Sequence, residues 1–230
     1  MKTMIDIHTH LIPGADDGSK TLEETKKIFL KYIDQGVKKI FLTPHVNSSV
    51  SKKSREYHRE YFDVLKEISR SYGLELFLGA EIYLPFRLPD LDYSKYTLGN
   101  SNALLVEFSP YNESPILDHA YNLKKRGYDI IVAHVERYSY LEINQIRELK
   151  NIGIYIQVNA SSLLKKGNVE YSKRAKKLLK ENLVDFIATD CHGLIKRPPF
   201  LKEAFNFLCK FVGKEYAKDL VFYNQEKLLF

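Results

Sequence analysis

Short runs of aliphatic and β-branched residues recur along the chain and alternate with longer amphipathic segments. Each run is about six residues long and several are bounded by glycine, asparagine or proline, which is typical of buried strands. The predicted strands lie at 4–10, 38–43, 74–79, 103–108, 129–134, 153–158 and 185–190. The longer segments between them predict helices.

Two of these helices carry clear end signals. The first is expected to begin at the capping-box pattern of Thr21 and Glu24 and to end before Gly36, because glycine readily adopts the left-handed conformation that closes a helix. The second is predicted within residues 54–73, where Tyr61, Leu65 and Ile68 share one helical face.

Repeated strand–helix alternation favours a parallel sheet. About seven such units suit a distorted β/α barrel better than a small open sheet, with a doubly wound sheet as the alternative. A chain of 230 residues is long enough for one large core, so we predict a single domain over 1–230. The loops at 85–100 and 109–116 contain Pro, Asn or Ser residues and are expected to border the mouth of the barrel.

Composition narrows the environment and the partners. The net charge of +6 and the pI near 9.0 come from Lys and Arg scattered over helix faces such as 171–182, which is typical of solvated surface, so no nucleic-acid partner is expected. The two cysteines, Cys191 and Cys209, are too few for a disulfide framework. The N-terminus lacks the apolar core of a signal peptide, and no apolar run approaches the ~20 residues that span a bilayer. We therefore predict a cytoplasmic protein without membrane insertion.

Imidazole and carboxylate side chains fall repeatedly at the C-terminal ends of the predicted strands. In the first strand, the two-residue alternation puts His8 and His10 on one face, with Ile5 and Ile7 on the other face toward the helices. The later strand ends carry His45, Glu81, Glu107, His134, Asp190 and His192. In a barrel these ends surround one mouth, where active sites lie.

A single buried His or Glu is usually a hydrogen-bonded structural residue, but a concentration of them is costly to desolvate unless cations compensate. Asp17 is expected to join from the first loop, with the alternative that Asp16 or Asp17 favours the following helix N-terminus. His58 and His119 fall inside helical segments and are excluded. Five imidazoles and four carboxylates suit Mn²⁺, Fe²⁺, Zn²⁺ or Co²⁺ better than Ca²⁺, and three such ions would leave about +2 of charge to attract phosphate.

These residues sit in the motifs DIHTH, TPH, GAEIY, VEFS, AHVERY and TDCH…RPP, and with them the chain resembles the polymerase-and-histidinol-phosphatase (PHP) family. Within it, the chain is most similar to the bacterial tyrosine-protein phosphatases of capsular and exopolysaccharide operons. The similarity spans almost the whole chain. Thr189 stands where Ser is common before the aspartate.

The resemblance implies a PHP-type distorted β/α barrel with a cluster of two or three divalent metals, manganese first, with iron, cobalt or zinc as alternatives. It implies that His8, His10, Glu81 and Asp190 enclose one edge of the cluster and that Glu107 and His134 enclose another. Asp17, His45 and His192 would complete it, and Asp17 is also counted with the catalytic residues. Arg137 and Arg197 are implied to hold phosphate, for which a guanidinium offers paired donors.

One further motif points to different chemistry. Cys191 and Arg197 have the spacing of the C-x5-R loop of cysteine-dependent phosphatases. The loop interior, however, contains the bulky pair Leu194 and Ile195, and strand alternation turns Cys191 away from the mouth. We therefore predict that a water activated by the cations attacks phosphorus without a covalent intermediate.

The predicted function is a metal-dependent protein-tyrosine phosphatase. The resemblance implies that its partner is the Tyr-rich C-terminal tail of a cytoplasmic tyrosine kinase that controls capsular or exopolysaccharide synthesis. A histidinol phosphatase or another small-molecule phosphoesterase of the same fold is the alternative, followed by a metal-dependent nuclease and a non-catalytic binding module. Lys52, Lys53 and Arg55 in the loop at 47–60 are expected at the rim, where a peptide would approach, unless that loop is only solvated surface.

Overall fold

All paired strands in the structure run parallel. The computed structural model describes residues 3–164 and 168–230. Within those ranges the strands are β1 (Met4–Asp6), β2 (Val37–Leu42), β3 (His45–Val46), β4 (Glu75–Leu78), β5 (Glu81–Tyr83), β6 (Ala103–Glu107), β7 (Asp129–Val132), β8 (Tyr155–Asn159) and β9 (Phe186–Ala188). They form a three-stranded sheet in the order β1-β2-β4 and a six-stranded sheet in the order β3-β5-β6-β7-β8-β9.

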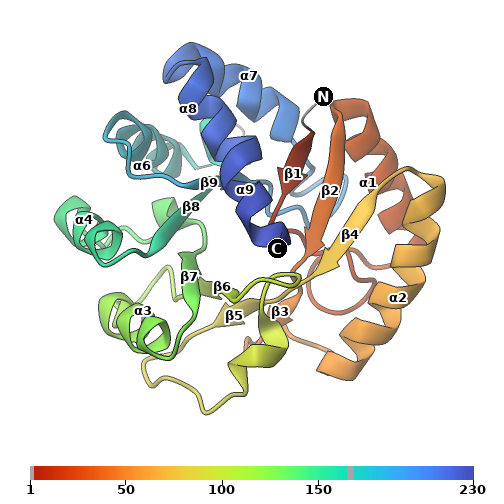
Figure 1. The fold of residues 1–230 in the computed structure, drawn as a ribbon, viewed down its shortest axis with the longest axis horizontal. Helices are drawn as coiled ribbons and strands as arrows, with labels where there is room; N and C mark the ends of the chain where they lie inside the picture. The colour runs from red at the N-terminus through yellow and green to blue at the C-terminus, as the bar shows by residue number, and fades with distance from the viewer. Residues whose placement is uncertain (1–2, 165–167) are drawn as a thin grey trace.

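The two sheets together form one ring. β2 and β3 are separated only by Thr43 and Pro44, and β4 and β5 only by Gly79 and Ala80, so these four segments act as two interrupted strands. The first and last strands meet near Thr9, where the amide of His10 donates to the carbonyl of Cys191 at 2.8 Å. Figure 1 shows the resulting ring. The prediction of a distorted β/α barrel with about seven strand–helix units is therefore confirmed, and the doubly wound alternative is wrong.

Helices cover the outside of this ring (Figure 1). In the described residues the α-helices are α1 (Leu22–Gln35), α2 (Arg55–Ser71), α3 (Ile116–Lys125), α4 (Ile143–Asn151), α5 (Ala160–Leu163), α6 (Val169–Lys180), α7 (Leu201–Phe211), α8 (Lys214–Lys218) and α9 (Asn224–Glu226). Short 3₁₀ turns lie at η1 (Tyr93–Tyr96), η2 (Val135–Arg137) and η4 (Lys227–Leu229), and a π turn lies at η3 (Asp219–Tyr223). None of the helices in the described ranges is both long and apolar enough to cross a membrane.

The first helix begins and ends where its sequence signals predict. The Thr21 side chain accepts the amide of Glu24, and Gly36 closes α1 with a φ of 77°. In a full capping box the Glu24 carboxylate would also accept the backbone amide of Thr21. Here it accepts the amide of Lys20 instead, at 2.9 Å. The second predicted helix is confirmed as α2, with Ser54 as its N-cap.

A small apolar cluster fills the inside of the ring, separate from the larger core between the strands and the helices. Its members come from opposite strands and from the C-terminal turn, and are Ile5, Ile7, Phe41, Leu98, Ala103, Leu105, Ile131, Ala133, Phe186, Ala188 and Leu228. Ile5 and Ile7 therefore face inward, and the prediction that they face the helices is wrong. The residue facing α1 is Asp6, which accepts the Tyr32 hydroxyl at 2.7 Å. Because β1 ends at Asp6, regular alternation does not continue to His8.

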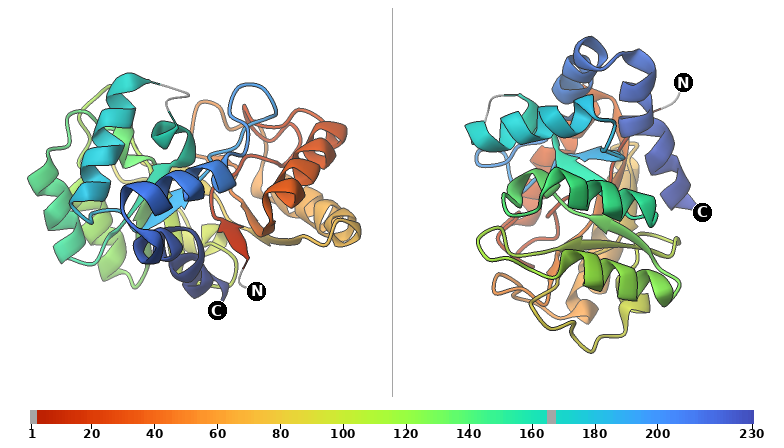
Figure 2. Two further views of the ribbon diagram at one scale, coloured as in Figure 1. Left: turned by 90° about the horizontal axis from the view of Figure 1, so that it is seen from above. Right: turned by 90° about the vertical axis from the view of Figure 1, so that its left-hand side faces the viewer.

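One of the two loops expected at the mouth, 85–100, lies partly elsewhere. Leu98 belongs to the interior cluster together with Leu228 of the C-terminal turn, and the amide of Gly99 donates to the carbonyl of Leu78 at 2.8 Å, so the second half of 85–100 lies at the opposite end of the barrel. The reason is geometric: in a parallel barrel the connection from β5 to β6 must run from one end to the other. Figure 2 shows that both chain termini also lie at that opposite end.

Candidate metal centre

The nine candidate ligand residues predicted from the sequence come together at the C-terminal ends of the strands. Eight of them form three overlapping groups in which the potential ligand atoms lie within 4.8 Å of one another. The groups are His8, His10, Glu81 and Asp190; His10, Asp17, His45 and His192; and His45, Glu81 and Glu107. The ninth residue, His134, joins through a 2.7 Å contact between its Nε2 and Glu81 Oε1.

The imidazoles of His8 and His10 point their lone pairs at one position. His8 Nδ1 lies 3.2 Å from Oε1 of the Gln157 side-chain amide, and His10 Nδ1 lies 2.8 Å from Asp16 Oδ2. Both partners are acceptors, so each Nδ1 donates to its partner, and whenever the rings are neutral each Nε2 carries a lone pair. The two Nε2 atoms are 3.2 Å apart, and each lies 3.2 Å from Glu81 Oε2. This arrangement of facing acceptors is one that a cation stabilises.

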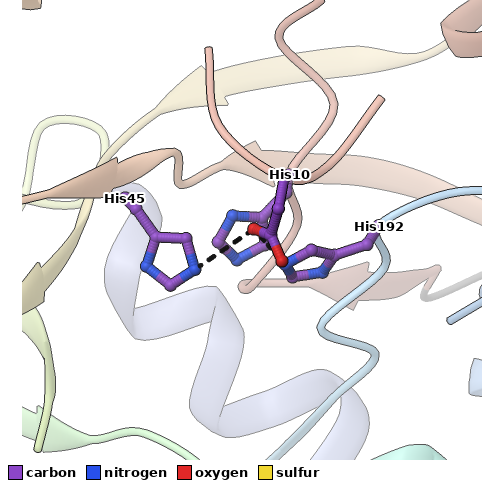
Figure 3. A group of neighbouring side chains, drawn as sticks. His10, His45 and His192 are labelled. Carbon is purple, nitrogen blue, oxygen red and sulfur yellow. Dashed lines mark ion pairs between the residues drawn. The ribbon is translucent and has the colours of Figure 1, made fainter. Parts of the chain in front are cut away.

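A second position lies between the rings of His10, His45 and His192, which Figure 3 shows turned toward one another. His192 Nδ1 contacts the carbonyl oxygen of Asp190 at 2.9 Å, which leaves Nε2 to face Asp17 Oδ1 at 3.2 Å. His45 Nε2 lies 3.7 Å from the same Asp17 oxygen. Asp17 thus reaches the cluster from the loop before α1, as predicted.

Glu81 lies at the centre of the cluster. Its Oε1 faces His134, while its Oε2 faces His8, His10 and His45 at 3.1–3.2 Å. Burial alone would raise the pKa of Glu81, but when His8 and His45 are protonated their positive charges outweigh burial and hold that pKa well below its ordinary value. A carboxylate that stays ionised with two oxygens in different directions can contact more than one cation.

Unpaired buried atoms indicate that this arrangement fits metal ions. His45 Nδ1, Glu81 Oε2 and His192 Nε2 are buried and have no hydrogen-bond partner among the described residues, although His45 Nδ1 lies 3.1 Å from Glu81 Oε2 and His192 Nε2 lies 3.2 Å from Asp17 Oδ1. Buried polar atoms are costly when unpaired, and all three point into the cluster. Imidazole and carboxylate groups are also the donors that borderline divalent ions prefer. The cluster is therefore able to hold metal.

Asp190 links the cluster to both arginines predicted to hold phosphate. Its Oδ1 faces His8 and His10, while its Oδ2 accepts Arg137 Nη2 at 2.6 Å and Arg197 Nη1 at 3.0 Å. Burial would raise the pKa of Asp190, but Arg197 and Arg137 outweigh it and hold the pKa well below its ordinary value. Both guanidinium groups line one cavity of about 260 Å³ together with Asp17, Glu81 and Glu107.

Three supporting residues were missed by the sequence reasoning. Asp16 orients His10 and also accepts the amide of His45 at 2.9 Å. Gln157 orients His8, and Asn159 donates to Asp190 Oδ2 at 2.8 Å. A signal existed, because Gln157 lies on the predicted strand 153–158 and Asn159 directly follows it, but amides are not typical ligands of the expected ions.

The backbone around the site is held in uncommon conformations. His134 and Asp190 have φ values of 35° and 53°, and they are two of the four non-glycine residues with positive φ in the described chain. Such conformations persist only where surrounding contacts enforce them, and they concentrate at functional sites. Gly18 is constrained differently: a Cβ there would overlap the carbonyl oxygen and the Cβ of His10.

Replacing Gly18 with alanine should therefore lower metal content as well as stability, because the loop carrying Asp16 and Asp17 must shift away from His10. We expect a loss of about 2 kcal/mol in the free energy of unfolding and a reduced metal-to-protein ratio by elemental analysis. Gly127→Ala is the matched control, since that position has a positive φ but open space around it. It should lose stability and keep its metal. Equal metal content in both variants would contradict the steric argument.

Cys191 lies outside the site, as its predicted orientation requires. Its side chain is fully buried in the core between strands and helices, and its Sγ contacts the carbonyl of Gly193 at 3.8 Å. Burial raises the pKa of the Cys191 thiol well above its ordinary value, which removes the thiolate that a cysteine phosphatase needs. His58 and His119 also lie apart from the cluster, on α2 and α3.

The basic loop at 47–60 borders the mouth only in part. Ser48 and Val50 line the metal cavity, and Lys52 and Lys53 are exposed nearby. The expectation that Arg55 lies at the rim is wrong. Its Nη1 donates to the carbonyl of Gly79 at 2.7 Å and its guanidinium lies over the Tyr96 ring, so it supports α2 instead.

The structure is a parallel β/α barrel that carries a buried cluster of His and carboxylate side chains, able to hold metal, at the C-terminal ends of its strands. The family model described as capsular polysaccharide synthesis, CpsB/CapC, matches residues 4–230. The chain belongs to this CpsB/CapC family.

Its relatives include tyrosine-protein phosphatases. CpsB of Streptococcus agalactiae serotype V, a tyrosine-protein phosphatase, is 34% identical over 242 residues, with 98% of each chain covered. CpsB of Streptococcus pneumoniae is 34% identical over 238 residues, with the same coverage. One solved structure comes from work on YwqE from Bacillus subtilis and CpsB from S. pneumoniae, which are described as unique metal-dependent tyrosine phosphatases. It matches this chain with a TM-score of 0.83 at 27% identity and covers 93% of this chain and 90% of that one.

More distant structures share the fold alone. A phosphotriesterase homology protein from Escherichia coli matches with a TM-score of 0.68 at 10% identity, covering 100% of this chain and 99% of that one.

Proposed function

We propose that this protein is a metal-dependent protein-tyrosine phosphatase. The observation that carries the proposal is the junction at Asp190, where one carboxylate joins a cluster able to hold metal to two guanidinium groups on the wall of the same cavity. Arginine pairs recognise phosphate oxygens, and the relatives of this chain are tyrosine-protein phosphatases. The comparisons favour this function over a histidinol phosphatase.

The nine clustered residues are proposed as the ligands of two or three divalent ions. Manganese is proposed first, and iron, cobalt or zinc would also suit this donor set. When bound, the ions lower the pKa of a water and stabilise negative charge on phosphorus oxygens. Asp16 and Gln157 orient His10 and His8 so that the Nε2 atoms face the ions, which is the usual role of groups behind a ligating imidazole.

Arg137 and Arg197 are proposed to bind the phosphate. Both are held at the cavity wall by carboxylates of the cluster, Arg137 by Asp190 and Arg197 by Asp190 and Asp17. These contacts fix the guanidinium groups before substrate arrives and leave other N–H donors for phosphate oxygens, since each guanidinium has five. Asp17 is proposed to serve both as a ligand and as the group that positions Arg197.

The depth of the cluster favours a long phosphorylated side chain. Glu81 and Asp190 in the lining of the metal cavity are buried, while Tyr111 in the same lining is 89% exposed. A phosphotyrosine can carry its phosphate from the rim to this floor, whereas a phosphoserine on the same backbone is shorter. The phenolate also leaves more easily than an alkoxide, because its conjugate acid has a pKa near 10. We further propose a cytoplasmic location and, as substrate, the phosphorylated tail of a bacterial tyrosine kinase that controls capsular or exopolysaccharide synthesis.

Two versions of one peptide, with phosphotyrosine or phosphoserine at the same position, test the substrate class. We expect kcat/KM for the phosphotyrosyl peptide to be at least about tenfold higher, because the shorter side chain cannot place its phosphate between the arginines and the cluster. Phosphate release in the presence of added manganese is the measurement. Equal rates on both peptides, or faster turnover of histidinol phosphate, would replace this proposal with the small-molecule alternative.

A further inference from the structure

A second cavity adjoins the metal cavity and shares one wall with it. Its volume is about 390 Å³, compared with about 260 Å³ for the metal cavity. Arg137, Arg197, Pro110 and Tyr111 line both cavities. The remaining wall of the second cavity is formed by Ser161, Ser162, Asn168, Tyr171 and Lys196. A chain that fills the first cavity with one side chain can therefore reach the second with another.

The charged side chains that line the second cavity are all positive. Three cationic side chains border it, those of Arg137, Arg197 and Lys196, and no carboxylate does. The two arginines are already paired with Asp190 and Asp17, but no carboxylate among residues 3–164 and 168–230 pairs with Lys196. An anionic group in this cavity would gain a partner that the described protein does not supply.

Another cavity bordered by Arg197 lacks this property. It has a similar volume, about 370 Å³, and Lys20, Lys196 and Arg197 border it, but Asp17 and Glu24 contribute two carboxylates to its lining. An anion there would face carboxylates as well as cations, so its net attraction would be weaker than in the second cavity. The difference in charge selects the cavity beside Tyr111 and Tyr171 as the one suited to an anion.

The walls also offer aromatic surface. Tyr111 is 89% exposed and Tyr171 is half-buried at the start of α6. Two aromatic rings beside a lysine provide both stacking surface and a positive charge for a side chain that carries a ring and an anionic group. The Ser162 hydroxyl is engaged by Glu136 at 2.7 Å and so contributes shape more than a free donor.

We propose that this second cavity binds another anionic side chain of the same peptide whose phosphotyrosine occupies the metal cavity. The chemistry required is a carboxylate or a phosphate within a few residues of the scissile phosphotyrosine, with Lys196 as its main electrostatic partner. This inference rests on the proposed phosphatase function and specifies its substrate as a peptide with a second negative charge.

The test uses a peptide series with one scissile phosphotyrosine and a varied neighbour, moved through each flanking position in turn. The neighbour is glutamine, glutamate or a non-hydrolysable phosphonate analogue of phosphotyrosine, so that only one site is turned over. At the favourable position we expect KM to fall about threefold for glutamate and about tenfold for the phosphonate, with kcat nearly constant, since the contact is made equally before and during reaction. Lys196→Gln should bring the three KM values together.

Lys177→Gln provides the matched control, because Lys177 is an exposed lysine of α6 outside the cavity lining and its loss changes the net charge equally. It should keep the KM ratios of the wild type. If the glutamine peptide is hydrolysed with tyrosine preference but the three KM values are equal in the wild type, the phosphatase function stands and this inference is wrong. The inference is also wrong if Lys196→Gln and Lys177→Gln reduce the KM ratios equally. Loss of tyrosine preference on the glutamine peptide would instead refute the proposed function.

Discussion

Replacing both His8 and His10 with alanine should abolish phosphatase activity, with a fall in kcat/KM on the order of a thousandfold or more. The two Nε2 atoms lie 3.2 Å apart and face Glu81 and Asp190, so the variant removes two donors from one position. The measurements are kcat/KM on a phosphotyrosyl peptide and metal content by elemental analysis. Chelation of the wild-type protein should have the same effect, with recovery on adding back manganese.

Cys191→Ser is the control that separates metal chemistry from thiol chemistry. Because the thiol is buried away from the cavity, this variant should retain most of its activity and all of its metal. Near-complete loss in the serine variant, with folding and metal content intact, would show that the thiol takes part. Full activity of the histidine double variant or of chelated wild type would show that the cluster does not.

Arg137→Ala should lower kcat/KM by on the order of a hundredfold while metal is retained. A charge-assisted contact to phosphate is worth a few kcal/mol in a water-poor site, and Arg137 is held toward the cavity by Asp190 at 2.6 Å. Burial would lower the pKa of Arg137, but Asp190 and Glu136 outweigh it and raise that pKa, so the guanidinium remains charged at any working pH. The measurement is steady-state kinetics alongside elemental analysis.

Two further variants sharpen this prediction. Arg137→Lys should recover only part of the lost activity, because an ammonium cannot reproduce the two parallel donors of a guanidinium. Arg147→Ala removes the same charge from an exposed ion pair with Glu181 on the outside of the barrel, and should act like the wild type. A wild-type rate for Arg137→Ala would remove this residue from the mechanism.

Much of the fold and the candidate site could be predicted from the sequence, since the candidate ligands other than Asp17 lie at or just after the ends of short apolar runs. The runs before His45, Glu81 and His134 predict strands, and parallel strands bring their C-terminal ends to one edge. The local signals of α1 were equally direct, because Thr21 and Gly36 act on neighbouring backbone groups. Strand periodicity and local caps depend on residues close in the chain, and a sequence displays these directly.

Only the tertiary structure decided which side chains meet across the barrel. Ile5 and Ile7 face inward because Asp6 bonds Tyr32 and Thr189, residues 26 and 183 positions away. Arg55 lies away from the rim because its guanidinium donates to the carbonyl of Gly79 and packs over the ring of Tyr96.

The same holds for the groups behind the ligands and for the second cavity. Gln157 lies 149 positions from His8, and Lys196 shares a cavity with Tyr111 although no pattern in the sequence connects them. The sequence by itself determined the alternation of strands and helices and the residue types at the strand ends, because these follow from local periodicity. The closed ring decided which way side chains point, which residues hydrogen-bond to the ligands and which charges line each cavity. These properties depend on contacts between residues far apart in the chain.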